Sequence, residues 1–85
     1  MFEFLSKVGK VDELVVPVFI EFADCLVKRR KELGWSQDKL AEESGINRVT
    51  IAKLETYQRV AGIETVLKLL HTLGMKIQFE DIKKE

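Results

Sequence analysis

One predicted helix carries side chains that can donate hydrogen bonds to the edges of DNA bases. Ile51 and Leu54 lie three residues apart, as they would on the buried side of a helix. Arg48, Val49 and Lys53 then face outward. A guanidinium can donate two hydrogen bonds to guanine, an ammonium can donate to the same edge, and a valine can pack on a thymine methyl. A solvated helix face would hold the same charges, so residue types alone leave both interpretations open.

Few other residues have the chemistry of a catalytic or metal site. Cys25 and His71 are the soft or titratable groups of catalytic interest. Neither has a second Cys, a Gly-rich loop or a neighbour at metal-ligand spacing. The sequence therefore predicts no enzyme, no catalytic residue, no metal site and no cofactor.

Two short helices, at about 36–43 and 47–56, must position the outward-facing residues. Ser36 can cap the first of them by accepting a hydrogen bond from a free backbone N–H. Gly45 supplies the left-handed backbone that ends a helix, and Asn47 can cap the next one. A three-residue break that contains Gly is typical of a helix-turn-helix, whose second helix can enter the major groove of DNA.

The sequence reads LGWSQDKLA at residues 33–41, SGINRVTI at 44–51 and LE at 54–55. These blocks, with their spacing, resemble the Cro/repressor-type (XRE-like) helix-turn-helix family, which reads roughly L-G-x-[ST]-Q-x-x-L-A, G-[VI]-x-x-x-x-[IV] and L-E. The resemblance extends from about Phe19 to Met75, two-thirds of the chain. The loop after the third helix of that family often reads Glu-x-Gly, and this chain departs from it with Tyr57 at the Gly position.

The resemblance implies a role for each polar position of the motif. Residues that match Arg48, Val49 and Lys53 contact base edges in the family. Arg30 falls on the apolar stripe of its helix, where a charge needs a partner. The family pairs the matching Arg with the residue at the position of Glu55, so we expect a structural ion pair. The expected contacts with the DNA backbone are Gln37, Asn47, Thr50 and Arg59.

Apolar periodicity predicts one helix before the motif and one after it. The first has Pro17 in its first turn, runs to Gly34, and has Phe19 and Phe22 as its largest core candidates. The last helix leaves Leu69 off its main stripe, either as an incidental exposed residue or as part of a dimer contact. That stripe is formed by Ile63, Val66, Leu67, Leu70 and Leu73.

The two ends of the chain lie outside these helices. Residues 75–80 alternate apolar and polar, which predicts a half-buried strand with Met75, Ile77 and Phe79 on its apolar face. An isolated strand is not stable in water, and the same strand from a second subunit is the simplest partner. Residues 1–16 are expected to form an N-terminal arm, 17–74 the helix-turn-helix domain and 81–85 a charged tail.

Composition limits the class of protein. The 85 residues suffice for one domain, and the single Cys excludes an intramolecular disulfide. No apolar run approaches the ~20 residues that cross a bilayer, so we expect a cytoplasmic protein with no membrane partner. The net charge is zero, but residues 28–59 hold eight Lys or Arg against five acids. The positive excess coincides with the helix-turn-helix.

We therefore expect an all-α, lambda-repressor-like helix-turn-helix domain of four helices with one C-terminal β-strand. The expected function is sequence-specific binding to double-stranded DNA by a homodimer, at a palindromic operator, as a transcriptional repressor. The strand-like ending resembles the antitoxins of toxin–antitoxin pairs, which favours an antitoxin-like autoregulator. The alternative is a protein-interaction module that neutralises a toxin or another partner and binds DNA poorly.

Overall fold

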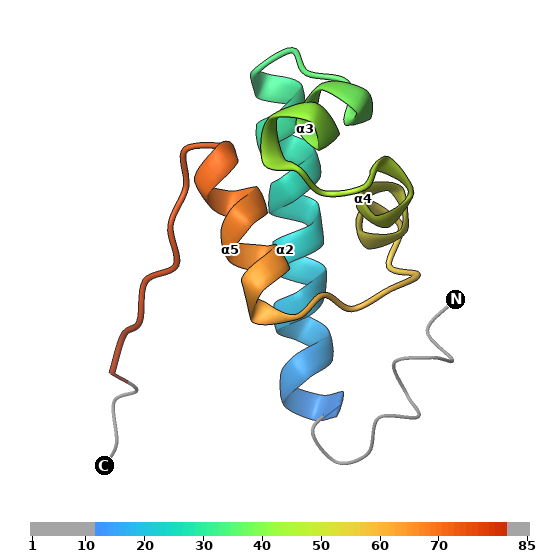
Figure 1. Ribbon diagram of the computed structural model, residues 1–85. Helices are drawn as coiled ribbons and strands as arrows, with labels where there is room; N and C mark the ends of the chain where they lie inside the picture. The colour runs from blue at the N-terminus through green and yellow to red at the C-terminus, as the bar shows by residue number, and fades with distance from the viewer. Residues whose placement is uncertain (1–11, 82–85) are drawn as a thin grey trace.

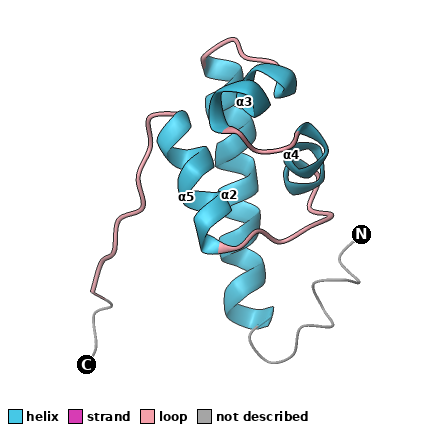
Figure 2. Ribbon diagram, in the orientation of Figure 1, coloured by secondary structure: helices cyan, strands magenta, loops and turns pink. Residues whose placement is uncertain are grey.

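The fold is a small bundle in which one long helix lies beside three short ones (Figure 1). The computed structural model describes residues 12–81. No strand occurs among these residues (Figure 2), so the predicted all-α class is confirmed for this part of the chain. The described helices are α2 (Asp12–Glu32), α3 (Gln37–Ser44), α4 (Arg48–Glu55) and α5 (Ile63–Thr72).

α2 contributes the longest face of the core. Phe19, Ala23 and Leu26 recur at intervals of three and four residues and are buried. The ring of Phe22 lies 6.0 Å from that of Phe19, centroid to centroid, and is half-buried. The sequence periodicity therefore identified the buried side of α2 correctly.

The start of α2 differs from the prediction. The helix begins at Asp12, so Pro17 lies inside it rather than in its first turn. Residues 12–16, which were predicted to belong to the N-terminal arm, are helical. Proline lacks the N–H that donates one turn back and costs about 3 kcal/mol inside a helix, which is why a sequence pattern predicts a helix start there. Residues 1–11, the rest of the predicted arm, lie outside the described residues.

The short helices complete the core with one or two side chains each. Leu40 of α3, Ile51 and Leu54 of α4, and Leu69 of α5 are fully buried, and Leu73, which directly follows α5, is nearly so. Within residues 12–81, no helix is both long and apolar enough to cross a membrane. The same part of the chain holds no cluster of three His, Cys, Asp or Glu residues that could bind a metal ion.

The buried side of α5 is only partly the one that the sequence predicted, since Leu70 and Leu73 of the predicted stripe are buried but its other members are not. Leu69, placed off the main stripe, is completely buried, whereas Ile63 and Leu67 of the predicted stripe are 67 % and 48 % exposed. Apolar residues occur all around this helix, so their spacing fits more than one inward face. Packing against α2 and α3 selects the face that carries Leu69, Leu70 and Leu73.

Each of the four described helices is followed by a residue with left-handed backbone, which after α3 is Gly45 (φ 77°). That residue is Gly34 after α2 (φ 73°) and Gly74 after α5 (φ 77°). After α4 it is Tyr57 (φ 61°), at the position where the family pattern has Gly. The N–H groups of Tyr57 and Gln58 bond to carbonyls in the last turn of α4 at 3.3 and 2.8 Å, which is the hydrogen-bond pair of a Schellman motif.

The side chain of Tyr57 links the end of α4 to α2. Its hydroxyl donates a hydrogen bond to Asp24 of α2. This bond raises the pKa of Tyr57, because the phenol must keep its proton to donate. A tyrosine at this position therefore makes a contact that glycine would lack, although its backbone conformation is unfavourable for any residue with a Cβ.

The C-terminal strand predicted for residues 75–80 is not formed in the described chain. Residues 75–81 have no helical or strand structure and run as a single segment along one side of the bundle (Figures 1 and 2). A strand needs the backbone of a partner, and no other described segment supplies one. Met75 packs against the core, whereas Phe79 is 94 % exposed.

We predict that Tyr57→Gly is more stable than Tyr57→Ala by about 1 kcal/mol, because alanine pays the left-handed backbone penalty and glycine does not. Both substitutions remove the same side-chain contacts, so their difference reports the backbone alone. Urea unfolding followed by circular dichroism measures it. Equal stabilities would show that the turn after α4 is not left-handed in solution.

Candidate nucleic-acid interface

α3 and α4 form a helix-turn-helix whose short turn is closed at both ends. The hydroxyl of Ser36 accepts a hydrogen bond from the backbone N–H of Lys39 at 3.0 Å. Gly45 ends α3 with left-handed backbone (φ 77°). The side-chain oxygen of Asn47 accepts from the backbone N–H of Val49 at 2.7 Å and starts α4. The three predicted capping roles are confirmed: Ser36 starts α3, and Gly45 and Asn47 close the turn between α3 and α4.

α4 has one buried side and one exposed side. Ile51 and Leu54 have no solvent exposure, so the core holds the helix in place. On the other side, Arg48, Val49 and Lys53 are all exposed, as predicted. The buried side of α4 therefore holds in place the helix that carries these three exposed side chains.

Arg48 forms an ion pair with a residue that the sequence analysis did not single out. Its Nε lies 2.8 Å from a carboxylate oxygen of Asp38 in the first turn of α3. Both side chains are more than half exposed, at 56 % and 78 %. The sequence does place an acid, Asp38, and a base, Arg48, in the first turns of two consecutive helices, which is a signal for an ion pair between them. Which of the nearby acids meets Arg48 depends on the angle between the helices.

Two of the predicted backbone-contacting residues lie together beside α4. The Nη1 of Arg59, in the loop after α4, donates a hydrogen bond to the hydroxyl of Thr50 at 3.3 Å. Thr50 stands one turn after Asn47, the N-cap of the same helix. The structure therefore brings Arg59 to Thr50, which is half-buried, one turn after Asn47.

Comparison with known proteins agrees with this geometry. A family model described as helix-turn-helix matches residues 26–79, which include all of α3, α4 and α5. The chain belongs to the helix-turn-helix family. It is also 36 % identical over 58 residues to a Haemophilus influenzae protein named as an uncharacterised HTH-type transcriptional regulator. That alignment covers 68 % of this chain and 59 % of the relative, so the chain spans less than two thirds of the relative's length. No solved structure matches the chain.

The helix-turn-helix is joined to α2 by a nearly buried ion pair, at the positions that the sequence predicted. The Nε and Nη2 of Arg30 donate to the two carboxylate oxygens of Glu55 at 2.7 and 2.9 Å. Its Nη1 donates to the backbone carbonyl of Trp35 at 2.9 Å. The side chains of Arg30 and Glu55 are only 11 % and 4 % exposed. The hydrogen bonds to Glu55 raise the pKa of Arg30 above its usual value, so the guanidinium stays charged.

Gln37 belongs to the same cluster. Its side-chain N–H donates to Glu55 at 2.9 Å, so the amide that was expected at the DNA backbone is bound within the domain. The hydrogen bond connects the first turn of α3 to the last residue of α4. One carboxylate thus binds a residue from α2 and a residue from α3.

We predict that Arg30→Met and Glu55→Gln each destabilise the fold by about 3–5 kcal/mol, because each leaves a nearly buried polar partner unpaired. The double variant should cost less than the sum of the two changes. Denaturant melts of the four proteins measure this coupling.

The exposed pair of Lys68 and Glu64, with 3.6 Å between its charged atoms, provides the control. Lys68→Met and Glu64→Gln should each change stability by less than about 1 kcal/mol. Strictly additive losses at Arg30 and Glu55 would mean that the two side chains do not meet in solution.

Proposed function

We propose that this protein is a sequence-specific DNA-binding transcriptional regulator that reads the major groove with α4. The observation that carries the proposal is the exposed side of α4, where Arg48, Val49 and Lys53 project from a helix that Ile51 and Leu54 hold against the core. In helix-turn-helix proteins the second helix of the motif lies in the groove. The Haemophilus influenzae relative, named as a transcriptional regulator, supports the same function.

Each of the three side chains has a partner among the base edges. Arg48 donates two hydrogen bonds to guanine, Lys53 donates to the same kind of edge, and Val49 packs on a thymine methyl. Phosphate contacts supply most of the sequence-independent affinity. Since the whole chain has no net charge, we expect weak non-specific binding to DNA. Residues 28–59, with eight basic and five acidic residues, supply the positive charge for this binding.

Asn47, Thr50 and Arg59 are the proposed contacts with the DNA backbone. Asn47 caps the start of α4, and Arg59 contacts Thr50 one turn further on, where the strands flanking the groove would pass. Gln37 is a weaker candidate than the sequence suggested, because its amide would have to leave Glu55 to reach a phosphate. Its main contribution is to the angle between α3 and α4.

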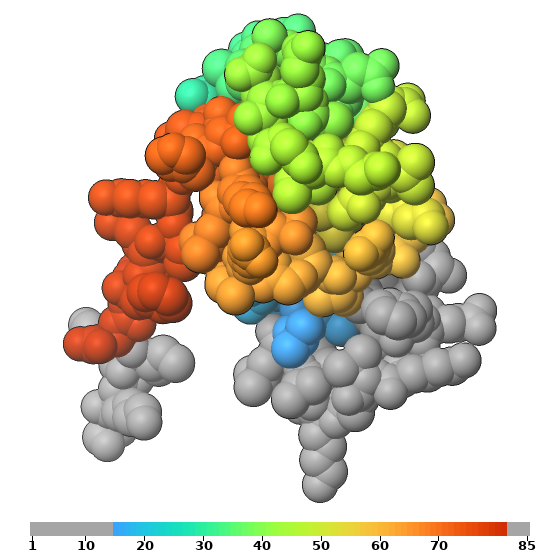
Figure 3. Space-filling view, viewed as in Figure 1, coloured from blue at the N-terminus to red at the C-terminus, as the bar shows by residue number. Residues whose placement is uncertain are grey.

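We further propose that the protein acts as a homodimer through an apolar face formed by Val18, Ile63, Leu67, Ile77 and Phe79. All five side chains are exposed, and Ile63 and Leu67 lie on the outer side of α5. In the space-filling view α5 forms the front of the molecule, with the C-terminal segment beside it (Figure 3). A patch of this kind is typical of a protein–protein contact.

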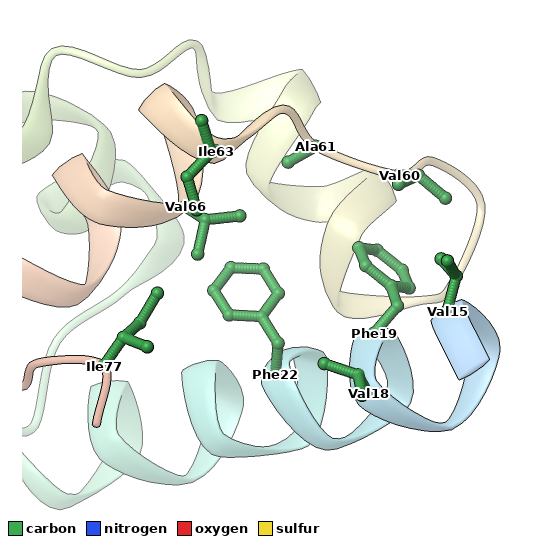
Figure 4. Close-up of a pocket in the computed structure, with 9 residues that line it drawn as sticks. All are labelled: Val15, Val18, Phe19, Phe22, Val60, Ala61, Ile63, Val66 and Ile77. Carbon is green, nitrogen blue, oxygen red and sulfur yellow. The ribbon is translucent and has the colours of Figure 1, made fainter. Parts of the chain in front are cut away.

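A groove of about 350 Å³ runs into this apolar face between α2, α5 and the C-terminal segment. Figure 4 shows Phe22 and Val66 facing each other across it, with Ile77 on its far side. Apolar side chains from a second copy would fill the groove. It is lined by Val15, Val18, Phe19, Phe22, Val60, Ala61, Ile63, Val66 and Ile77.

The dimer also accounts for the alternation at residues 75–80. Pairing this segment antiparallel with its copy across a two-fold axis would satisfy backbone groups that have no strand partner within the described chain. Met75, Ile77 and Phe79 would then form the apolar side of a two-stranded ribbon. If the two copies of α4 lie ~34 Å apart they enter successive major grooves, so the operator would be palindromic.

Repression by an antitoxin-like autoregulator is the specific role that we favour. In that role the protein binds the promoter of its own operon, and a cognate toxin is the second partner. The alternative function, a module that neutralises a toxin and binds DNA poorly, is favoured by the exposed apolar face and the zero net charge. It is opposed by the exposure of Arg48, Val49 and Lys53 on one helix of the motif.

We predict that Arg48→Ala weakens binding to the specific duplex by about 1–3 kcal/mol and barely changes binding to a scrambled one, because a base contact carries sequence information. Mobility-shift titrations on the DNA upstream of its own gene, and on the scrambled sequence, measure both. Lys68→Ala, which removes an equal charge from α5, is the control and should have no effect on the difference. A wild-type protein that does not distinguish the two duplexes would favour the alternative function.

We predict that a chain ending at Lys76 sediments as a monomer, whereas the full chain sediments as a dimer. This truncation removes Ile77 and Phe79 but keeps Met75, whose N–H bonds to Leu70 at the end of α5 at 2.8 Å. A chain ending at Glu80 is the control and should remain a dimer. If the chain ending at Lys76 stays dimeric, the C-terminal segment is not part of the interface.

A further inference from the structure

We infer that Asp38 determines specificity in this protein by holding Arg48 in the orientation that reads guanine. The inference rests on the proposed function of α4. Asp38 itself need not touch a base, and it acts through the side chain of Arg48. The observation behind it is the 2.8 Å contact between a carboxylate oxygen of Asp38 and the Nε of Arg48, which joins the first turns of α3 and α4.

The contact has little to do with the stability of the fold. Asp38 and Arg48 are 78 % and 56 % exposed, and exposed ion pairs add little to stability. The spacing of the two helices is set by the capped turn and by buried side chains such as Leu40 and Ile51. The carboxylate is therefore presented to Arg48 at a position that the core has already determined.

Because Asp38 lies beside Nε, the terminal nitrogens of Arg48 stay available for a base. A guanidinium is a planar fork of five N–H donors. With the carboxylate of Asp38 beside Nε, the two terminal nitrogens lie at the far end of the fork, and they match the spacing of O6 and N7 on guanine. Holding the long side chain in this orientation before binding lowers the entropy lost in the complex.

The negative charge of Asp38 also acts against binding in the wrong register. A carboxylate beside α4 repels the phosphates of any duplex. When the duplex offers no base that binds Arg48, no favourable contact offsets this repulsion. Removing the carboxylate should therefore favour non-specific DNA slightly while weakening the preference for guanine. A charge that acted only through repulsion would instead change the affinity for all duplexes by the same factor.

The same helix offers a matched control. Glu42 stands one turn after Asp38 on α3, so it carries the same charge on the same side of the helix. Its ion-pair partner is Lys39, at 4.0 Å, rather than Arg48. Substituting Glu42 changes the charge of this surface without touching the contact with Arg48.

The experiment is selection from a randomised duplex library, followed by competition titrations on the selected site and on its single-base variants. Four variants are compared with wild type: Asp38→Ala, Asp38→Asn, Glu42→Ala and Arg48→Ala. Wild type should prefer guanine at one position, and Arg48→Ala should lose that preference. Asp38→Ala should reduce it at least about fivefold at that position alone. The guanine preference of Asp38→Asn, which keeps a side-chain oxygen beside Nε, should fall between those of wild type and Asp38→Ala. The preference of Glu42→Ala should match that of wild type.

The affinity ratio between two duplexes cancels any difference in the fraction of folded protein, so a partly unfolded variant still gives an answer. If Asp38→Ala keeps the wild-type ratio at the position that depends on Arg48, the inference is overturned. A uniform change on all duplexes, equal to that of Glu42→Ala, overturns it as well. If Arg48→Ala also leaves every ratio unchanged, the failure lies with the proposed function of α4.

Discussion

The position of the helix-turn-helix depends on one carboxylate, that of Glu55. Arg30 of α2 donates two hydrogen bonds to it and Gln37 of α3 donates a third, while Arg30 also reaches the carbonyl of Trp35. An arginine removed from water carries a large desolvation cost, and these contacts offset it at a single geometry. Because the contacts come from α2, α3, α4 and the turn before α3, moving any one helix would leave a nearly buried charge without partners.

Hydrogen bonds that fix the positions of the helices are important in this domain because its apolar core is small. α3 and α4 have eight residues each and bury only Leu40, Ile51 and Leu54 between them. Helices this short are not stable alone in water, so caps and tertiary contacts must hold them. Side chains on the exposed side of α4 are then free to vary without altering the fold. Such a separation of scaffold and exposed surface is what the proposed base-reading role of α4 requires.

The apolar groups that the monomer leaves exposed are concentrated on α5, the first half of α2 and the C-terminal segment. This distribution differs from the scattered exposed apolar side chains of most monomers. Contact with another chain would cover these exposed groups and could pair the C-terminal segment, which has no strand partner among the described residues. Both features support the proposed homodimer.

The sequence by itself determined the elements whose causes are local. Caps at Ser36 and Asn47 and the left-handed Gly45 act within a few residues, so the bounds of α3 and α4 followed from residue types. The pair of Arg30 with Glu55 was also predicted. The position of Arg30 on an apolar stripe showed that its charge needs a partner, and the family resemblance identified Glu55 as that partner.

Tertiary structure decided the rest. It selected the inward face of α5, because apolar residues surround that helix, and it extended α2 to Asp12 through Pro17, where the sequence pattern predicted a helix start. It alone paired Gln37 and Asp38 with their partners, since such contacts depend on angles between helices that no local pattern encodes.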